Sequence, residues 1–138
     1  MSVTIPTKML PSGAQIPVIG FGAYLESHVS DSYNVVLSAL KQGYRHIDSA
    51  QLYHNEAAVG QAVRIPREGL FVTSKLFLTD WGYKKALASV RKSNEEIGLG
   101  YIDLFLLHAP GDTSTHPATL PRVRRLGARW RSSNNKVS

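Results

Sequence analysis

The chain has 138 residues, 43% of them hydrophobic, so the sequence predicts one domain at most, with a buried core. It contains no cysteine, which excludes a disulfide framework, a thiol nucleophile and a thiolate metal site. No apolar run approaches the roughly 20 residues of a membrane span, and Pro6 and Lys8 interrupt any signal-peptide core, so we expect a cytoplasmic protein without membrane contact.

The formal net charge of +6 is concentrated near the end of the chain. Residues 1–110 hold ten Lys or Arg and nine Asp or Glu, a balance of +1, whereas residues 111–138 hold six and one, a balance of +5. The sequence therefore divides into a folded unit, residues 1–112, and a basic irregular tail, residues 113–138.

A β-hairpin, a strand and a helix are predicted first. Residues 8–10 and 15–18 flank the turn-forming residues 11–14, a pattern typical of a short hairpin, and residues 18–22 follow as a buried strand. Ser30 or Asp31 can cap the helix and Gly43 can end it. Its inward residues recur at helical spacing: Tyr33, Val36, Leu37 and Leu40.

Three further strands, residues 44–47, 70–74 and 102–107, alternate with two helices. Asn55 can cap the first of these helices, which should not pass Pro66; Asp80 can cap the second, which Gly98 ends. Regular alternation predicts a parallel sheet with right-handed crossovers, either a doubly wound sheet or a (β/α)8 barrel.

Four polar residues fall at or just after the ends of these strands: Asp48, Tyr53, Lys75 and His108. Parallel strands place their carboxyl ends on one rim, where these groups suggest proton transfer. Lys75 can favour release of the Tyr53 proton because an ammonium stabilises a phenolate, and Asp48 can fix that ammonium. His108 can donate a hydrogen bond to a carbonyl oxygen on which negative charge develops.

Each of these residues also has a purely structural interpretation. Asp48 and Lys75 can form a rim ion pair worth under about 1 kcal/mol. Tyr53 can cover the sheet as a loop aromatic, and His108 can cap a strand end. The histidines show no metal-ligand spacing, so no metal site is expected.

Gly20 and Gly22 supply two of the three glycines of a dinucleotide fingerprint, but Leu25 stands at the third position. Residues 26–29 also separate this loop from the next helix, whereas a Rossmann loop opens directly into its helix. A turn at a strand end is therefore the favoured interpretation, and it still allows backbone contact with a flat ring.

Five segments together resemble the aldo-keto reductases. In chain order they are residues 20–24 (GFGAY), 43–50 (GYRHIDSA), 53–56 (YHNE) with Val59 and Gly60, 71–76 (FVTSKL) and 101–110 (YIDLFLLHAP). The resemblance covers about residues 5–112. It implies a (β/α)8 TIM barrel, an NADPH cofactor (less often NADH), and reduction of small-molecule aldehydes or ketones to alcohols.

The resemblance also implies residue roles. Tyr53 would be the proton donor, Lys75 and Asp48 would tune it, and His108 would orient the carbonyl. The residues expected at the cofactor are Gly22, Ala23, Tyr24 and Asp48, and those expected at the substrate are Tyr24, Trp81 and His108. Trp81 equally fits packing against the third helix.

Two alternatives follow from the end of the resemblance near Asp112. A whole barrel needs roughly 250 residues, and the four predicted βα units make half of one. The chain could thus be a truncated, inactive reductase fragment that self-associates through open sheet edges or needs a partner. A basic tail could also bind RNA or DNA electrostatically, which we do not favour because no nucleic-acid-binding fold is visible. Its arginines are Arg122, Arg124, Arg125, Arg129 and Arg131.

Overall fold

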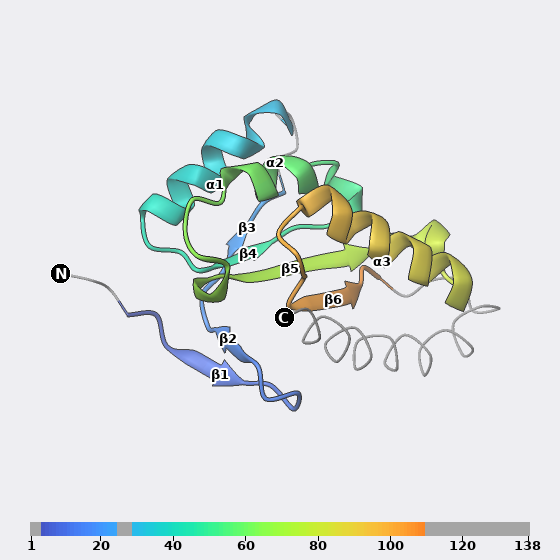
Figure 1. Cartoon of the computed structure of the whole chain (residues 1–138), viewed down its shortest axis with the longest axis horizontal. Helices are drawn as coiled ribbons and strands as arrows, with labels where there is room; N and C mark the ends of the chain where they lie inside the picture. Colours follow the sequence, from blue (N-terminus) through green and yellow to red (C-terminus); the bar gives the residue numbers. More distant parts are fainter. Residues whose placement is uncertain (1–3, 25–28, 110–138) are drawn as a thin grey trace.

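The computed structural model describes residues 4–24 and 29–109 (Figure 1). The predicted tail at residues 113–138 and its arginines lie outside the described residues. The domain boundary at residue 112 and the nucleic-acid hypothesis therefore stay predictions.

The predicted hairpin is confirmed. Strands β1 (Thr7–Met9) and β2 (Gln15–Pro17) pair antiparallel, with Lys8 opposite Ile16. Gly13 in the connecting turn has a φ of +82°, a left-handed conformation that glycine adopts without a steric penalty.

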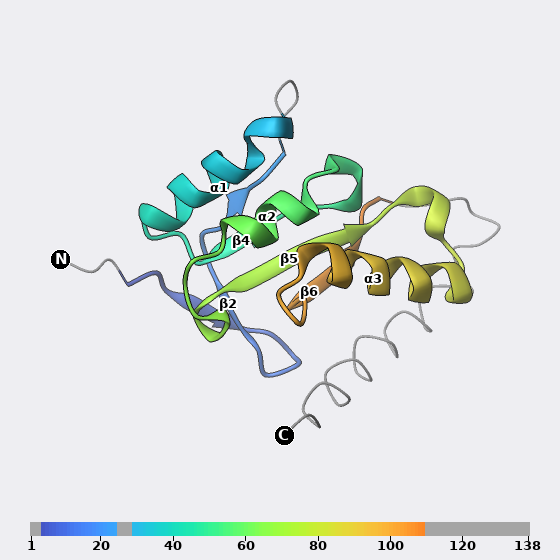
Figure 2. The same cartoon turned by 45° about the horizontal axis from the view of Figure 1, so that its top comes forward.

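A four-stranded parallel sheet forms the centre of the molecule. Its strands are β3 (Phe21–Gly22), β4 (His46–Asp48), β5 (Phe71–Leu76) and β6 (Leu104–Leu107), in that spatial order. The spatial order repeats the chain order, and the α-helices lie on one face of the sheet (Figure 2). A doubly wound sheet reverses its strand order and carries helices on both faces, so the barrel-type alternative is confirmed.

Within residues 4–24 and 29–109, three α-helices and four short 3-10 helices connect these strands. The α-helices are α1 (Ser32–Lys41), α2 (Glu56–Ala62) and α3 (Tyr83–Ile97). The 3-10 helices are η1 (Val29–Asp31), η2 (Gln51–Tyr53), η3 (Arg67–Gly69) and η4 (Leu78–Asp80). Among the helices that the structure describes, none combines the length and apolar character needed to span a bilayer.

The core lies between the sheet and its helices. Val36 of α1, Ile47 of β4, Val59 of α2 and Val72 of β5 are fully buried there. α2 and α3 approach closely at Gly60, where a Cβ would stand only 1.7 Å from the Ile97 carbonyl oxygen. Any larger residue at Gly60 would therefore force the two helices apart.

The predicted buried strand at residues 18–22 is wrong in two respects. Only Phe21 and Gly22 pair in β3, and Val18 and Ile19 are 56% and 54% exposed. Within the described residues β2 ends at Pro17 and β3 begins at Phe21, so Val18 and Ile19 belong to neither sheet and no neighbouring strand covers them.

The predicted side-chain caps are also wrong. Asp31 and Asn55 stand at the N-cap positions of α1 and α2 but make no capping hydrogen bond through their side chains. Asp80 lies in η4, and Gly82 precedes α3 instead. The Asn55 amide and the Asp80 carboxylate are taken by tertiary hydrogen bonds, to Ala23 O and from Ser89 Oγ respectively. Gly98, with a φ of +66°, ends α3 as predicted.

Candidate active site

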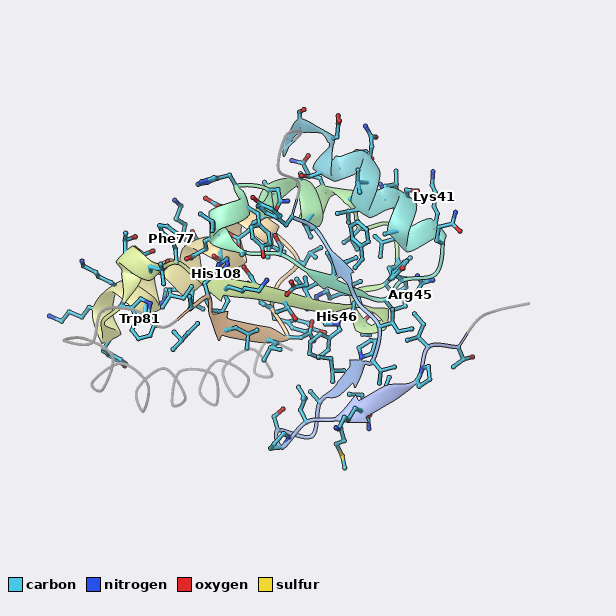
Figure 3. All side chains as sticks on the ribbon, turned by 180° about the vertical axis from the view of Figure 1, so that it is seen from behind. Lys41, Arg45, His46, Phe77, Trp81 and His108 are labelled. Carbon is cyan, nitrogen blue, oxygen red and sulfur yellow. The ribbon has the colours of Figure 1, made fainter. Side chains whose placement is uncertain are left out.

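The four predicted polar residues come together at the carboxyl end of the sheet. Asp48 is the last residue of β4, Tyr53 ends the 3-10 turn that follows it, and His108 comes directly after β6. Lys75 lies inside β5 rather than after it, because the strand continues to Leu76. Figure 3 shows His108 at the end of the molecule opposite Arg45, which follows the turn after α1.

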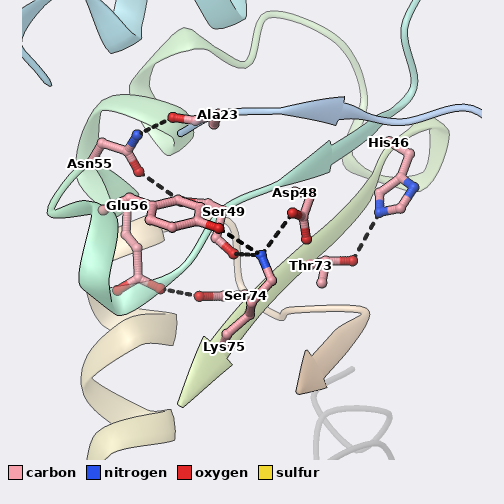
Figure 4. A network of polar contacts seen from close by, with 10 residues as sticks. Ala23, His46, Asp48, Ser49, Asn55, Glu56, Thr73, Ser74 and Lys75 are labelled. Carbon is pink, nitrogen blue, oxygen red and sulfur yellow. Dashed lines mark hydrogen bonds and ion pairs between the residues drawn. The ribbon is translucent and has the colours of Figure 1, made fainter. Parts of the chain in front are cut away.

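Lys75 is the centre of the site. Its Nζ donates to Asp48 Oδ2 at 2.7 Å, to the Ser49 carbonyl oxygen at 3.0 Å and to the Tyr53 hydroxyl at 3.3 Å (Figure 4). An ammonium has three protons, so these three acceptors use all of them. The Lys75 side chain is 14% exposed, and its charge is therefore held at a fixed point beside the phenol.

Aromatic rings surround the Tyr53 phenol. The His108 ring meets it edge to face with centroids 5.7 Å apart, and the Tyr24 ring lies 5.0 Å away on a tilted plane. Tyr24 is 57% exposed, so the site opens to solvent on that side. His108 Nδ1 is buried and has no hydrogen-bond partner in the part of the chain that the structure describes. The imidazole can therefore accept or donate one more hydrogen bond.

The predicted cofactor-contacting segment lies beside Asp48. Ala23 is 2% exposed, and its N–H donates to the Asp48 carbonyl oxygen at 2.8 Å. A Cβ built on Gly22 would meet no atom within 4 Å, so the space above this backbone is open within the described structure. A flat ring could approach the backbone here, and the cofactor roles of Gly22, Ala23, Tyr24 and Asp48 remain predictions.

Trp81 lies between η4 and α3 and is 6% exposed. Figure 3 places it at the same end of the molecule as His108. Its location agrees with either interpretation of this residue, so its contact with a substrate remains a prediction.

Two cavities lie elsewhere on the described surface. One of about 810 Å³ lies between the β1–β2 hairpin and the amino ends of the strands, beside Arg45 and Asp103. The other, of about 560 Å³, lies behind the Tyr53 turn and is lined by Gln51, Phe77 and Ser93 among others. Neither of these two cavities is lined by any of the four polar residues.

A buried polar network behind the site was missed at the sequence level. Asn55 donates to the Ala23 carbonyl oxygen at 2.7 Å and accepts from Ser49 Oγ at 2.7 Å (Figure 4). Glu56 accepts from Ser74 Oγ at 2.5 Å and from Ser93 Oγ at 3.0 Å. Glu56 stands three residues before Val59, so helical periodicity alone could have placed it on the inward face of α2.

Burial shifts the pKa of two groups near the site. It raises the pKa of the Glu56 carboxyl above 4.5, although hydrogen bonds from Ser74 and Ser93 act in the opposite direction. It lowers the pKa of His46 below 6.5, although the nearby Asp48 carboxylate opposes this change. His46 also forms a 2.9 Å hydrogen bond with Thr73 Oγ1 through Nε2.

This arrangement, a parallel βα sheet with Lys, Tyr, Asp and His at its carboxyl end, matches a known class of barrel proteins. The model of the aldo/keto reductase family matches residues 18–126, and the chain belongs to this family. The glycerol 2-dehydrogenase (NADP(+)) of Saccharomyces cerevisiae is 47% identical over 109 residues, which cover 75% of this chain and 34% of that protein.

Solved structures agree with this assignment. An aldo/keto reductase from Brucella melitensis has a TM-score of 0.81 and 36% identity over 91% of this chain and 50% of its own. An aldo-keto reductase of Bombyx mori in complex with NADP has a TM-score of 0.77 and 30% identity over 91% of this chain and 48% of its own. The chain spans less than half the length of the curated relatives compared with it, 34% of the yeast glycerol 2-dehydrogenase and 47% of an aldo-keto reductase of Mycolicibacterium vanbaalenii.

Proposed function

We propose that the chain carries the proton-transfer half of an NADPH-dependent carbonyl reductase that converts aldehydes or ketones to alcohols. The observation that carries this proposal is the placement of the Tyr53 hydroxyl 3.3 Å from the Lys75 ammonium, with His108 packed against the same ring. A phenol, a cation fixed beside it and an imidazole packed on the same ring are groups that protonation of a carbonyl oxygen can use.

The residues of the chain divide the chemistry between them. Tyr53 gives its proton to the substrate oxygen, and Lys75 stabilises the phenolate that remains. Asp48 holds the ammonium in place through their 2.7 Å ion pair. His108 binds the carbonyl oxygen before the transfer and thereby directs it toward Tyr53. Water then returns a proton to the phenolate.

The cofactor supplies the hydride that the carbonyl carbon receives. The residues present fit a nicotinamide, since the backbone at Gly22 is open and the Asp48 carboxylate lies next to it in the sheet. The proposal of NADPH over NADH is supported by similarity to the yeast NADP(+) enzyme and to the silkworm reductase solved with NADP.

The decisive test uses the purified, folded chain with NADPH and a panel of small aldehydes and ketones. We expect loss of nicotinamide absorbance with at least one carbonyl, and a rate lower by at least about 100-fold with Tyr53→Phe. Cofactor binding is followed separately by nicotinamide fluorescence. A folded chain that binds NADPH but reduces none of the carbonyls would contradict the catalytic proposal.

We also propose a second copy of the chain as a partner. Among the described residues β3 and β6 each pair on one side only, and Leu106 on β6 is 39% exposed. Unpaired strand edges recruit other strands, and two four-stranded parallel sheets joined edge to edge would reach the eight strands of a closed barrel. Sedimentation analysis should show a dimer or larger species, and a monodisperse monomer would contradict this proposal.

A further inference from the structure

The Tyr53 hydroxyl is held only weakly on its own side of the site. Among the described residues it makes one hydrogen bond, to Lys75 Nζ at 3.3 Å, which is longer than a typical bond of this kind. Its ring also contacts Tyr24 and His108, with its centroid 5.0 Å from Lys75 Nζ, and Tyr24 is largely exposed. The position of the phenol therefore also depends on the η2 turn that carries it.

The start of that turn is fixed from behind by Gln51, two residues before Tyr53. Gln51 Oε1 accepts a hydrogen bond from the Phe77 N–H at 2.8 Å. Phe77 follows β5 directly and stands two residues after Lys75. One end of the Gln51 amide is thus tied to the strand that carries the ammonium.

The other end of the Gln51 amide is tied to α3. Its Nε2 donates to Ser89 Oγ at 2.6 Å and to Ser93 Oγ at 2.9 Å, and it lies 3.1 Å from the Ser89 carbonyl oxygen. Both hydroxyls are buried and pass their own protons on to carboxylates, Ser89 to Asp80 and Ser93 to Glu56. Gln51 is therefore the donor that orients these hydroxyls, and a rotated amide would leave Phe77 N–H and both acceptors unmatched.

The end of the turn is fixed by different residues. Asn55 binds Ala23 and Ser49, and Glu56 binds Ser74. The Asn55–Ser49 bond joins the two ends of the turn and the other contacts locate the start of α2, but none of them reaches the chain just beyond Lys75. Of Gln51, Asn55 and Glu56, only Gln51 connects the first residue of the η2 turn to Phe77, just beyond Lys75.

We propose that Gln51 is a positioning residue, whose amide sets the register of the Tyr53 hydroxyl against Lys75 and His108. The inference rests on the proposed reductase function for its catalytic consequence, but the placement of Tyr53 can be tested without activity. A proton donor displaced by about 1 Å can lose up to about 100-fold in rate, so a small movement of this turn matters.

The experiment compares Gln51→Leu with Leu52→Ala, a matched control on the same turn. Leu52 is 42% exposed and makes none of these amide contacts, so its removal should leave the site unchanged. The direct readout is the NMR chemical shift of the His108 ring protons, which respond to the Tyr53 ring packed against them. We expect these signals to move in Gln51→Leu and to stay in place in Leu52→Ala.

Three further measurements complete the test. Hydrogen exchange at the Phe77 amide should accelerate in Gln51→Leu, because its acceptor is gone. The double variant Ser89→Ala/Ser93→Ala should move the His108 signals too, and adding Gln51→Leu to it should move them by less than Gln51→Leu does alone, since only the Phe77 contact is then left to remove. With an aldehyde and NADPH, kcat should fall about 10- to 100-fold while KM for the aldehyde is unchanged.

The outcomes separate the two proposals. If the wild-type chain shows no turnover, the reductase function fails, and the His108 signals still decide whether Gln51 positions Tyr53. A folded Gln51→Leu chain with His108 signals at their wild-type positions would overturn the inference. If that variant does not fold, Gln51→Glu takes its place, because it keeps the Phe77 acceptor and loses only the donation to α3; unmoved His108 signals there would overturn it equally.

Discussion

The two ends of the sheet each carry a short ion pair, and the two pairs are built differently. At the amino end Arg67 Nη2 lies 2.6 Å from Asp103 Oδ2, and at the carboxyl end Lys75 Nζ lies 2.7 Å from Asp48 Oδ2. The side chains of Arg67 and Asp103 are 13% and 16% exposed, whereas those of Lys75 and Asp48 are 14% and 33% exposed. Similar distances therefore accompany different access to solvent.

Their other partners differ more. Arg67 also donates to the Leu70 and Tyr101 carbonyl oxygens and stacks 3.7 Å from the centroid of the Tyr101 ring. Asp103 accepts from the Val72 N–H as well, so this pair fastens the η3 loop to the starts of two strands. Lys75 also donates to one backbone oxygen, that of Ser49, but its remaining proton faces a phenol that can lose a proton. An ion pair with no titratable hydroxyl among its hydrogen-bond partners supports the fold, whereas one that faces such a hydroxyl can support chemistry.

The largest expected effect breaks the carboxyl-end site. Tyr53→Phe removes the proton donor and leaves the ring contacts in place, so kcat for aldehyde reduction should fall by about 10²- to 10⁴-fold with little change in unfolding. Tyr101→Phe is the control at the amino end, since it keeps the ring against Arg67 and lies far from the chemistry. Equal rates for wild type and Tyr53→Phe in a steady-state assay would remove Tyr53 from the mechanism.

The next prediction compares Arg67 and Lys75, the cations of the two ion pairs, by replacing each with methionine. Arg67→Met should lower the free energy of unfolding by about 3 kcal/mol, because it leaves the Asp103 carboxylate enclosed without its cation. Lys75→Met should cost about 1 kcal/mol, because water can reach Asp48, yet it should greatly reduce turnover. Urea titrations of both variants measure the difference. If Lys75→Met lost more stability than Arg67→Met, the Lys75–Asp48 pair would be the one that supports the fold, contrary to our assignment.

A third prediction concerns Glu56, a buried carboxyl near the site that has hydroxyl partners. Because burial raises its folded-state pKa above 4.5, the native chain binds this proton more tightly than the unfolded chain. The protonated Glu56 carboxyl therefore adds to the free energy of unfolding at pH values below 4.5, the pKa of the unfolded chain. This contribution is lost as the pH rises through the raised pKa of the folded chain. Glu56→Gln should flatten this part of the profile of unfolding free energy against pH. Superimposable profiles would show that Glu56 does not titrate differently on folding.

The smallest effect is expected at an exposed pair. Lys92 and Glu96 are one helical turn apart on α3, with 3.6 Å between Nζ and Oε1 and exposures of 73% and 45%. Lys92→Ala should change the free energy of unfolding by less than about 0.5 kcal/mol, and added salt should reduce the difference further. A loss as large as that of Arg67→Met would mean that distance, and not enclosure, decides what an ion pair contributes.

Much of the site could be predicted because strand polarity is a local property. Asp48 and His108 were placed at one rim from the positions of the strands they follow, and the structure brings them there together with Tyr53 and Lys75. The strand ends were less accurate, since β5 continues through Lys75 to Leu76. Pairing of Lys75 with Leu106 of β6 extends this strand, and such pairing depends on a distant segment.

The predicted side-chain caps of the helices were wrong for a related reason, because distant residues bind the capping side chains instead. Asn55 has the residue type that caps helices, but its amide is used by Ala23, 32 residues away in sequence. Local propensity cannot anticipate a competing partner of that kind, because the partner is brought near only by folding.

The amino-acid sequence by itself determined the alternation of strands and helices, the common direction of the strands and the rim on which the polar residues gather. These follow from hydrophobic periodicity and chain direction, which each segment carries alone. Only the tertiary structure decided how the Tyr53 turn is held. Gln51 and Ser93 are 42 residues apart in sequence and meet because α3 packs behind that turn, so their contact exists only once the layers are assembled.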